Sequence, residues 1–313
     1  MKKLIAMLLA LVMVLSLCAC NKKDDGAAEE EKETAYLLTE VVMTSTDDDG
    51  KAHTMKANLE YDDDYNVIGL KSYEDGELVY ERTFNKDIEK PLLDLGYDED
   101  GEVNDRTEYT YDDKGNLLEC KGSYTYGGVT TTFREVCTYD GNGNKLTEKS
   151  YRNGELDYEY TYTYTATGNV ATEIYISSSG YKSHYTYSYD EHDNVVSVKE
   201  EYKHDGEVSS YELTYENTYE NGKIVKHVSN LGTDTYTYNS AGKITEYSYT
   251  SSEGNTKRMT CTYDDNGMPI GVKHYEGGEV RMEYTLTYKE VEVSKETAEK
   301  IEAIVEKLGM FDY

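Results

Sequence analysis

Several short segments of the chain alternate aromatic residues with residues that carry a hydroxyl group. In residues 109–111 and 236–238, for example, two tyrosines flank a threonine. Successive side chains of a β-strand point to opposite faces, so this alternation predicts strands with one aromatic face and one hydroxyl face. In four segments the aromatic face extends further back, to Tyr160, Tyr185, Tyr215 and Tyr284.

A three-residue motif, made of a hydroxyl residue, an aromatic residue and a polar residue in that order, recurs along the chain, as in Thr110–Asp112 and Thr138–Asp140. Its aromatic residues, here called the anchors, are Tyr61, Phe84, Tyr111, Tyr139, Tyr164, Tyr189, Tyr219, Tyr238, Tyr263 and Tyr288. Successive anchors are about 25 residues apart, and a constant period of this size predicts a repeat architecture.

Two kinds of turn separate the strands. After an anchor come segments such as Asp112–Asn116 and Asp140–Asn144, in which the first carboxylate can accept backbone N–H groups while Gly or Asn reverses the chain. About half a period later the chain reverses again, as in Tyr73–Leu78 and Tyr151–Leu156. Each repeat is therefore predicted to be two antiparallel strands with two tight turns.

The repeat region resembles YD repeats of the RHS type over residues 59–293, because of the hydroxyl–aromatic–acidic phrases. The second turn phrase, Tyr-x-x-Gly-Glu-Leu at Tyr151–Leu156, is also similar to MORN-variant repeats. The RHS resemblance implies β-hairpin units that wind into a curved sheet. We therefore expect an all-β fold: tandem β-hairpin repeats of about 25 residues forming a long curved antiparallel meander, open or partly closed.

The N-terminus has the features of an export signal over residues 1–20. Lys2 and Lys3 precede the apolar run Leu4–Leu17, which is too short for a membrane-spanning helix. The following residues, 17–20, resemble a bacterial lipobox, with Cys20 as the lipidated residue. This resemblance implies an exported protein anchored by acyl chains to the outer face of the cell membrane. A simple cleaved signal is the alternative.

The predicted domains follow from changes in pattern along the rest of the chain. Residues 21–34 are acidic and lack apolar periodicity, so they are predicted to form a disordered tether. Residues 35–293 form the repeat domain. In residues 294–309, Ser294 can cap a helix whose apolar stripe contains Ala298, Ile301, Ile304, Val305 and Leu308. This amphipathic helix is predicted to cap the last exposed strand edge, with partner binding as the alternative.

Charge and composition narrow the classes of function. The net charge of −30 opposes binding to nucleic acid. A low content of branched aliphatic residues at such charge is typical of disordered chains. The 34 tyrosines oppose that conclusion, because each ring can bury a large aromatic surface. We expect a folded domain in which tyrosine replaces aliphatic residues.

Candidate chemistry is sparse. Cys137 and Cys261 lie two residues before an anchor and are predicted to fill packing positions. A disulfide between Cys120 and Cys137 remains open. The six histidines lack metal-ligand spacing, and we expect no catalytic, cofactor or metal residues and no enzyme activity. Alternating oxygen residues occur in residues 62–66 and 140–144; turn formation explains them, and weak calcium binding remains open.

Two functions fit these observations. The first is a surface-displayed binding or adhesion module that contacts a glycan or protein ligand through its tyrosine rows. The second is a structural scaffold or shell fragment related to RHS polymorphic-toxin systems, with the tyrosines forming the core. The exposure of Tyr160, Tyr162, Tyr185, Tyr187, Tyr236 and Tyr284 distinguishes them. An exposed strip favours binding, and a buried column favours the scaffold.

Overall fold

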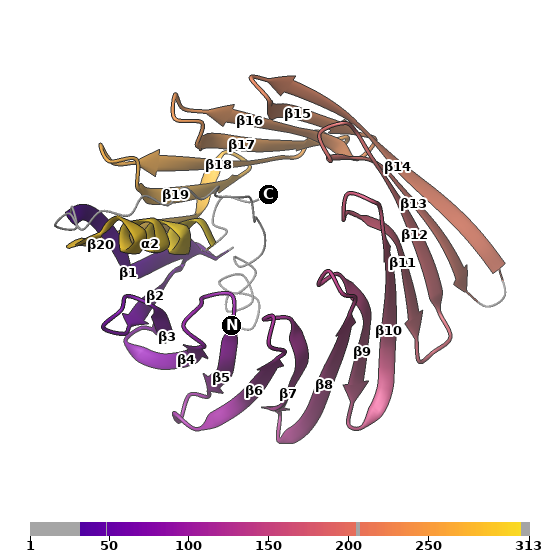
Figure 1. The fold of residues 1–313 in the computed structure, drawn as a ribbon, viewed down its shortest axis with the longest axis horizontal. Helices are drawn as coiled ribbons and strands as arrows, with labels where there is room; N and C mark the ends of the chain where they lie inside the picture. The colour runs from indigo at the N-terminus through magenta and orange to yellow at the C-terminus, as the bar shows by residue number, and fades with distance from the viewer. Residues whose placement is uncertain (1–31, 48, 205–206, 308–313) are drawn as a thin grey trace, which may run out of the picture. The chain divides into compact units, whose positions relative to one another are not determined.

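The computed structural model describes residues 32–47, 49–204 and 207–307, which form antiparallel strands followed by a helix (Figure 1). The elements are β1 (Lys32–Thr46), β2 (Ala52–Tyr61), β3 (Val67–Glu74), β4 (Glu77–Phe84), β5 (Pro91–Tyr97), β6 (Val103–Tyr111), β7 (Leu117–Tyr126), β8 (Val129–Tyr139), β9 (Lys145–Arg152), β10 (Glu155–Tyr164), β11 (Val170–Ser177), β12 (Lys182–Tyr189), β13 (Val195–His204), β14 (Glu207–Glu220), β15 (Lys223–Ser229), β16 (Gly232–Tyr238), β17 (Ile244–Ser251), β18 (Thr256–Tyr263), β19 (Pro269–Glu276), β20 (Glu279–Ser294) and α2 (Lys295–Lys307).

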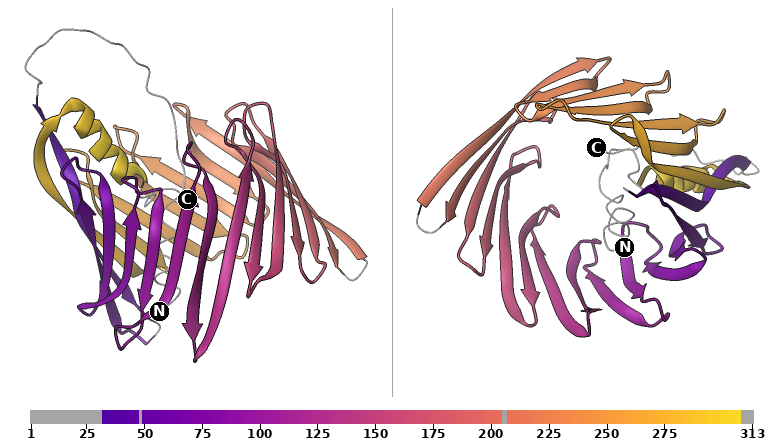
Figure 2. Two further views of the ribbon diagram at one scale, coloured as in Figure 1. Left: turned by 60° about the horizontal axis from the view of Figure 1, so that its bottom comes forward. Right: turned by 180° about the vertical axis from the view of Figure 1, so that it is seen from behind.

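The chain divides into two compact units. Of the described residues, unit 1 comprises 32–47, 49–92, Cys261–Lys273 and 281–307, and unit 2 comprises 93–204, 207–260 and His274–Val280. In unit 2 the strands from β6 to β17 follow one another as consecutive hairpins (Figures 1 and 2). Each of these strands pairs antiparallel with the next one, which confirms the all-β prediction.

The predicted open or partly closed meander is wrong, because β1 does not lie at an edge. It pairs with β2 along one side and with β20 along the other, from Lys32 opposite Ser294 to Ser45 opposite Met282. The first and last strands of the described chain thus satisfy each other's backbone groups, and the sheet is closed rather than open. A strand edge that would template association is thereby removed.

The anchors mark strand ends, as the turn chemistry predicts. β2, β4, β6, β8, β10, β12, β16 and β18 each end on an anchor aromatic residue. In the turn after Tyr111, Asp112 Oδ1 accepts the backbone N–H groups of Lys114 at 2.9 Å and Asn116 at 2.8 Å. Gly115 adopts a φ of +88°, a conformation that glycine reaches without a steric penalty. The turns after Tyr139 and Tyr189 use Asp140 and Asp190 in the same way.

Several anchor tyrosines also join the end of one strand to the start of the preceding, paired strand through their hydroxyl groups. Tyr139 donates to the backbone carbonyl of Leu117 at 2.8 Å, and Tyr164 donates to that of Lys145 at 2.7 Å. Equivalent bonds link Tyr189 to Val170, Tyr238 to Ile224 and Tyr288 to Pro269. Most of these acceptors are the first residue after the preceding anchor turn. These anchors therefore add a side-chain hydrogen bond between strands that are already paired through their backbones.

Replacing Tyr164 with phenylalanine is expected to lower the free energy of unfolding by about 1 kcal/mol, because the Lys145 carbonyl loses its hydroxyl donor. The measurement is urea unfolding followed by circular dichroism. Tyr126→Phe serves as the control, since that side chain is 75% exposed. Equal unfolding midpoints for the two variants would contradict a stabilising role for the anchor hydroxyl.

The two units have different interiors. Unit 1 has a conventional apolar core that includes Leu38, Met43, Val67 and Ile301, each 1% exposed or less. In the described part of unit 2, the buried hydrophobic residues are Cys137 and Met259. The sheet of unit 2 is therefore stabilised by its backbone ladders and by lateral contacts between half-buried tyrosines, rather than by an aliphatic core.

The C-terminal helix forms as predicted but does not cap a strand edge. The Ser294 hydroxyl accepts the N–H of Thr297 at 3.3 Å, which is the expected N-cap contact. Ala298 and Ile301 pack with Ala35, Leu37 and Val293 of the paired strands β1 and β20. Because β20 is already paired, the helix covers an apolar sheet face instead. Leu308 and Gly309 lie outside the described residues, as does the side chain of Val305.

Candidate ligand-binding face of unit 2

The tyrosine rows are neither an exposed strip nor a buried column. Tyr160, Tyr162, Tyr185, Tyr187 and Tyr236 are half-buried, and Tyr284 in unit 1 is 4% exposed. The intervening residues Thr161, Thr163, Thr186 and Thr237 are exposed. This contrast confirms the predicted alternation of an aromatic and a hydroxyl face. In unit 2 the aromatic face remains partly open to solvent, which neither functional hypothesis anticipated.

Six tyrosines on β10–β13 and the β11–β12 turn form a continuous series of ring contacts, here called the ladder: Tyr158, Tyr160, Tyr162, Tyr175, Tyr181 and Tyr202. Tyr160 lies at its centre, with ring centroids 4.9 Å from Tyr175 and 6.0 Å from Tyr162. The rings of Tyr160 and Tyr162 are nearly parallel, at 13°. Such spacings are typical of attractive aromatic pairs.

Cross-strand register brings the ladder together from residues distant in sequence. Cys137 is opposite Glu148, which is opposite Tyr160, and Tyr160 is in turn opposite Tyr175. The row continues through Ser183 to Tyr202. A parallel row places Glu173 and Glu200 on either side of Tyr185. Carboxylates therefore alternate with tyrosines on the same face, an arrangement that alternation along single strands does not predict.

Hydroxyl groups hold the Glu200 carboxylate in place and make a longer contact with that of Glu173. Tyr185 donates to Glu200 Oε1 at 2.8 Å, and Ser183 Oγ lies 2.9 Å from the same oxygen. Ser183 has no exposed surface. Tyr187 contacts Glu173 Oε2 at 3.5 Å. Burial raises the pKa of Glu173, and burial together with the Glu200 carboxylate raises the pKa of Tyr185 to about 12.

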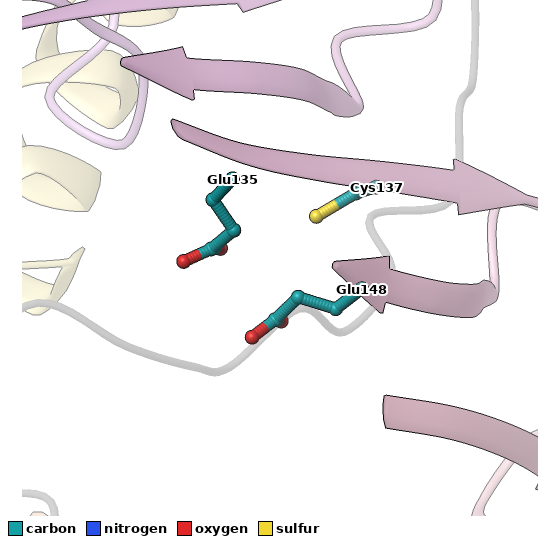
Figure 3. Close-up of side chains that lie close together, drawn as sticks. All are labelled: Glu135, Cys137 and Glu148. Carbon is teal, nitrogen blue, oxygen red and sulfur yellow. The ribbon is translucent and has the colours of Figure 1, made fainter. Parts of the chain in front are cut away.

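A second group lies at the β8–β9 side of the ladder and contains Glu135, Cys137 and Glu148 (Figure 3). Ligand atoms of the three residues lie within 4.8 Å of one another, a spacing compatible with a metal ion. The ammonium of Lys145, however, lies 2.8 Å from Glu148 Oε2. Burial raises the pKa of the Cys137 thiol, and a protonated thiol is a poor ligand or nucleophile. The group already has an internal cation.

The cysteines confirm part of the sequence analysis. Cys137 and Cys261 are 3% and 5% exposed, as predicted for packing positions. Cys120 and Cys137 are free thiols, so no disulfide joins them. Cys120 lies opposite Glu135 on the neighbouring strand, and burial, reinforced by that carboxylate, raises its thiol pKa to about 12.

Glu135 should make unit 2 more stable at mildly acidic pH than at neutral pH. Burial and the nearby Glu148 carboxylate raise its pKa above 4.5. The folded state therefore binds this proton more tightly than the unfolded chain, and stability falls as pH rises through the interval between the unfolded and folded pKa values. We expect Glu135→Gln to increase the unfolding midpoint at neutral pH and to flatten the pH dependence. Glu155→Gln, at an exposed position, is the control. Identical pH profiles would contradict the assignment.

The remaining sequence predictions concern the lipid-anchor residue and the candidate calcium ligands. Cys20, the predicted lipid-anchor residue, lies outside the described residues, as do the signal segment and most of the tether. Asp140 and Asp62 direct their carboxylate oxygens to backbone and side-chain N–H groups of their own turns. No helix in the described part of the chain has both the length and the apolar character needed to cross a membrane.

Comparison with known proteins gives only structural neighbours. No family model matches the chain, and no curated protein does. The TcdB2–TccC3 toxin structure matches 77% of this chain and 16% of its own, with 13% identity and a TM-score of 0.32. A porin-like protein from Bacteroides uniformis matches 81% of this chain and 98% of its own, with 14% identity and a TM-score of 0.35. The chain thus spans about a sixth of the toxin chains that it matches. The RHS resemblance stays an expectation.

Proposed function

We propose that the protein is a non-catalytic, lipid-anchored module on the outer face of the bacterial cell membrane, and that it binds glycans through the tyrosine ladder of unit 2. The observation that supports this proposal is the series of half-buried rings from Tyr162 to Tyr202, with carboxylates between them. Ring faces can stack on the apolar faces of sugars, while oriented carboxylates accept sugar hydroxyl groups.

The ladder is a better platform for a ligand than the anchors are. An anchor tyrosine such as Tyr164 uses its hydroxyl to join two parts of the sheet. Tyr160, in contrast, makes its described contacts through its ring. Tyrosine also offers a rigid, amphipathic contact area at a low cost in conformational entropy.

The test uses the chain from Asn21 onward, which retains every described residue, presented to an array of cell-wall and other glycans. We expect saturable binding to at least one glycan, and at least tenfold weaker binding by Tyr175→Ala, because the Tyr175 ring contacts three other rings of the ladder. Tyr126→Ala is the matched control, because that residue is exposed at a hairpin tip. Circular dichroism of both variants confirms that they fold. Absence of saturable binding by the unmodified chain would reject the proposal.

Anchoring is tested independently of ligand binding. Changing Cys20 to alanine in the full chain removes the thiol to which the acyl chain would attach, so we expect the protein to leave the membrane fraction. Fractionation followed by immunoblotting measures the distribution. A variant that stays with the membrane would show that Cys20 is not the anchor.

A scaffold function is the second candidate, and the anchor hydrogen bonds favour it. Tyr139, Tyr164 and Tyr189 each reinforce the pairing of two neighbouring strands, which is what a load-resisting shell would need. Such a shell requires no ligand at the ladder. If no array member binds, while the Tyr164→Phe variant loses stability as expected, the scaffold becomes the better proposal.

A further inference from the structure

The carboxylates around the ladder lack enough cations to balance them. Glu135, Glu148, Glu173 and Glu200 lie on this face, and Lys145 is bound to Glu148. Arg152, further along β9, is bound to Asp157 at 3.1 Å. Within the described residues, Glu135, Glu173 and Glu200 have no ion-pair partner. The face therefore presents an excess of negative charge beside aromatic rings.

The carboxylates retain acceptor positions for a ligand. Both Tyr185 and Ser183 contact the Oε1 atom of Glu200, and no hydrogen bond is formed by Oε2 in the described part of the chain. Glu173 likewise uses one oxygen, Oε2, toward Tyr187. A carboxylate held by neutral donors is an oriented acceptor, and a charged donor gives it a stronger hydrogen bond than a neutral one does.

The rings favour the same kind of ligand. The face of an aromatic ring carries partial negative charge, so it attracts an ammonium group within about 6 Å of its centroid. Tyr160 lies opposite Glu148 on β9, and Tyr162 lies opposite Glu173 on β11. A cation between these residues would contact ring faces and carboxylates together. Neutral N-acetyl or hydroxyl substituents would leave the charge uncompensated.

We infer that the ladder selects glycans that carry free amino groups over glycans in which the same positions are N-acetylated or hydroxylated. This inference rests on the proposed glycan-binding function and specifies its ligand class by charge complementarity. The ladder supplies stacking surface for sugar rings, and Glu173 and Glu200 supply acceptors for the ammonium groups. A basic protein segment offers the same charge but not the flat, hydroxylated faces that fit a series of rings.

The test compares three hexasaccharides of the same linkage by calorimetry with the chain from Asn21 onward. They are β-1,4-linked glucosamine, N-acetylglucosamine and glucose, used at mildly acidic pH, where the amines are protonated. We expect the glucosamine oligomer to bind at least tenfold more tightly than either neutral oligomer. The preference should shrink as salt concentration rises, because the attraction between charges is screened.

Two variants test whether Glu200 and Glu173 cause the preference for the glucosamine oligomer. Glu200→Gln preserves the shape of the side chain and removes its charge, so we expect the preference for the glucosamine oligomer to fall severalfold while binding of the neutral oligomers persists. Glu201→Gln is the matched control, because Glu201 is exposed and pairs with Lys199 on the opposite face. Glu173→Gln provides a second test on the same face should Glu200→Gln disturb folding through Ser183.

The possible outcomes distinguish a failure of the amine preference from a failure of glycan binding itself. Equal affinity for all three oligomers would overturn the amine preference and leave glycan binding intact. Tight binding of glucosamine oligomers that both Glu200→Gln and Glu173→Gln leave unchanged would place the selectivity elsewhere and overturn the inference. Binding of oligolysine but of no oligosaccharide would show that the face takes a basic peptide, and both proposals would fail. Binding of nothing would reject the proposed function itself.

Discussion

Gly122→Ala should be among the most damaging single substitutions in unit 2. A Cβ atom at this position would lie 1.9 Å from the backbone oxygen of Arg106 and 2.9 Å from the ring of Phe133. Gly122 is paired with Thr107 on β6 and with Phe133 on β8. Neither neighbouring strand can therefore move away without breaking backbone hydrogen bonds of the sheet. We expect the free energy of unfolding to fall by about 3 kcal/mol or more, at the upper end of overpacking costs.

A second glycine in the same unit provides a matched control. Gly141 also has a φ outside the left-handed region, and a Cβ built there meets no atom within 4 Å. Gly141→Ala should therefore be neutral or slightly stabilising, because alanine restricts the unfolded chain. Denaturant unfolding and hydrogen exchange of the β6–β8 amides compare the two variants. Similar midpoints would show that the close approach at Gly122 is not a constraint.

Much of the fold could be predicted because its local signals agree. The anchors end strands, and Asp112, Asp140 and Asp190 form the turns that their side chains allow. Sheet closure could not be predicted from these signals. β1 carries no anchor phrase and begins at Lys32, inside the segment whose composition indicates a tether. Its pairing with β20 links residues about 250 positions apart, and no local sequence pattern predicts a contact over such a separation.

The sequence predicts the tyrosines of the ladder face but not the carboxylates among them. Alternation places the ladder residues Tyr160 and Tyr162, and the neighbouring Tyr185, on one face, and the structure confirms that placement. The carboxylates among them could not be found, because Glu173 and Glu200 are two of 62 acidic residues and only cross-strand register brings them beside Tyr185. A signal was nevertheless present: Glu173 and Tyr175, and Glu200 and Tyr202, have the period-two spacing of one strand face.

The anchors also form hydrogen bonds that amino-acid composition alone does not predict. Tyrosine was expected to replace an aliphatic core, and in unit 2 it does so only in part. Tyr139 and Tyr164 contribute hydroxyl hydrogen bonds to backbone carbonyls, whereas phenylalanine could contribute burial alone. This need for a donor at the ring edge gives a physical reason for 34 tyrosines and only 3 phenylalanines.

Ile301→Ala should be the most damaging change in α2. The side chain is 1% exposed and packs with Leu37 and Val293, on the two strands whose pairing closes the sheet. Removing it leaves a cavity between the helix and the β1–β20 pair, which the paired strands cannot collapse to fill. We expect a loss of about 2–5 kcal/mol in the free energy of unfolding of unit 1.

Glu302→Ala is the control for this helix, since Glu302 is the next residue and is exposed. Alanine has a high helix propensity, so that variant should keep the stability of the unmodified chain. Hydrogen exchange provides the decisive readout. If α2 stabilises the closure, Ile301→Ala will increase exchange at β1 and β20 amides as well as in the helix. Faster exchange confined to α2 would show that β1 and β20 hold together without it, and that the helix only covers an apolar face.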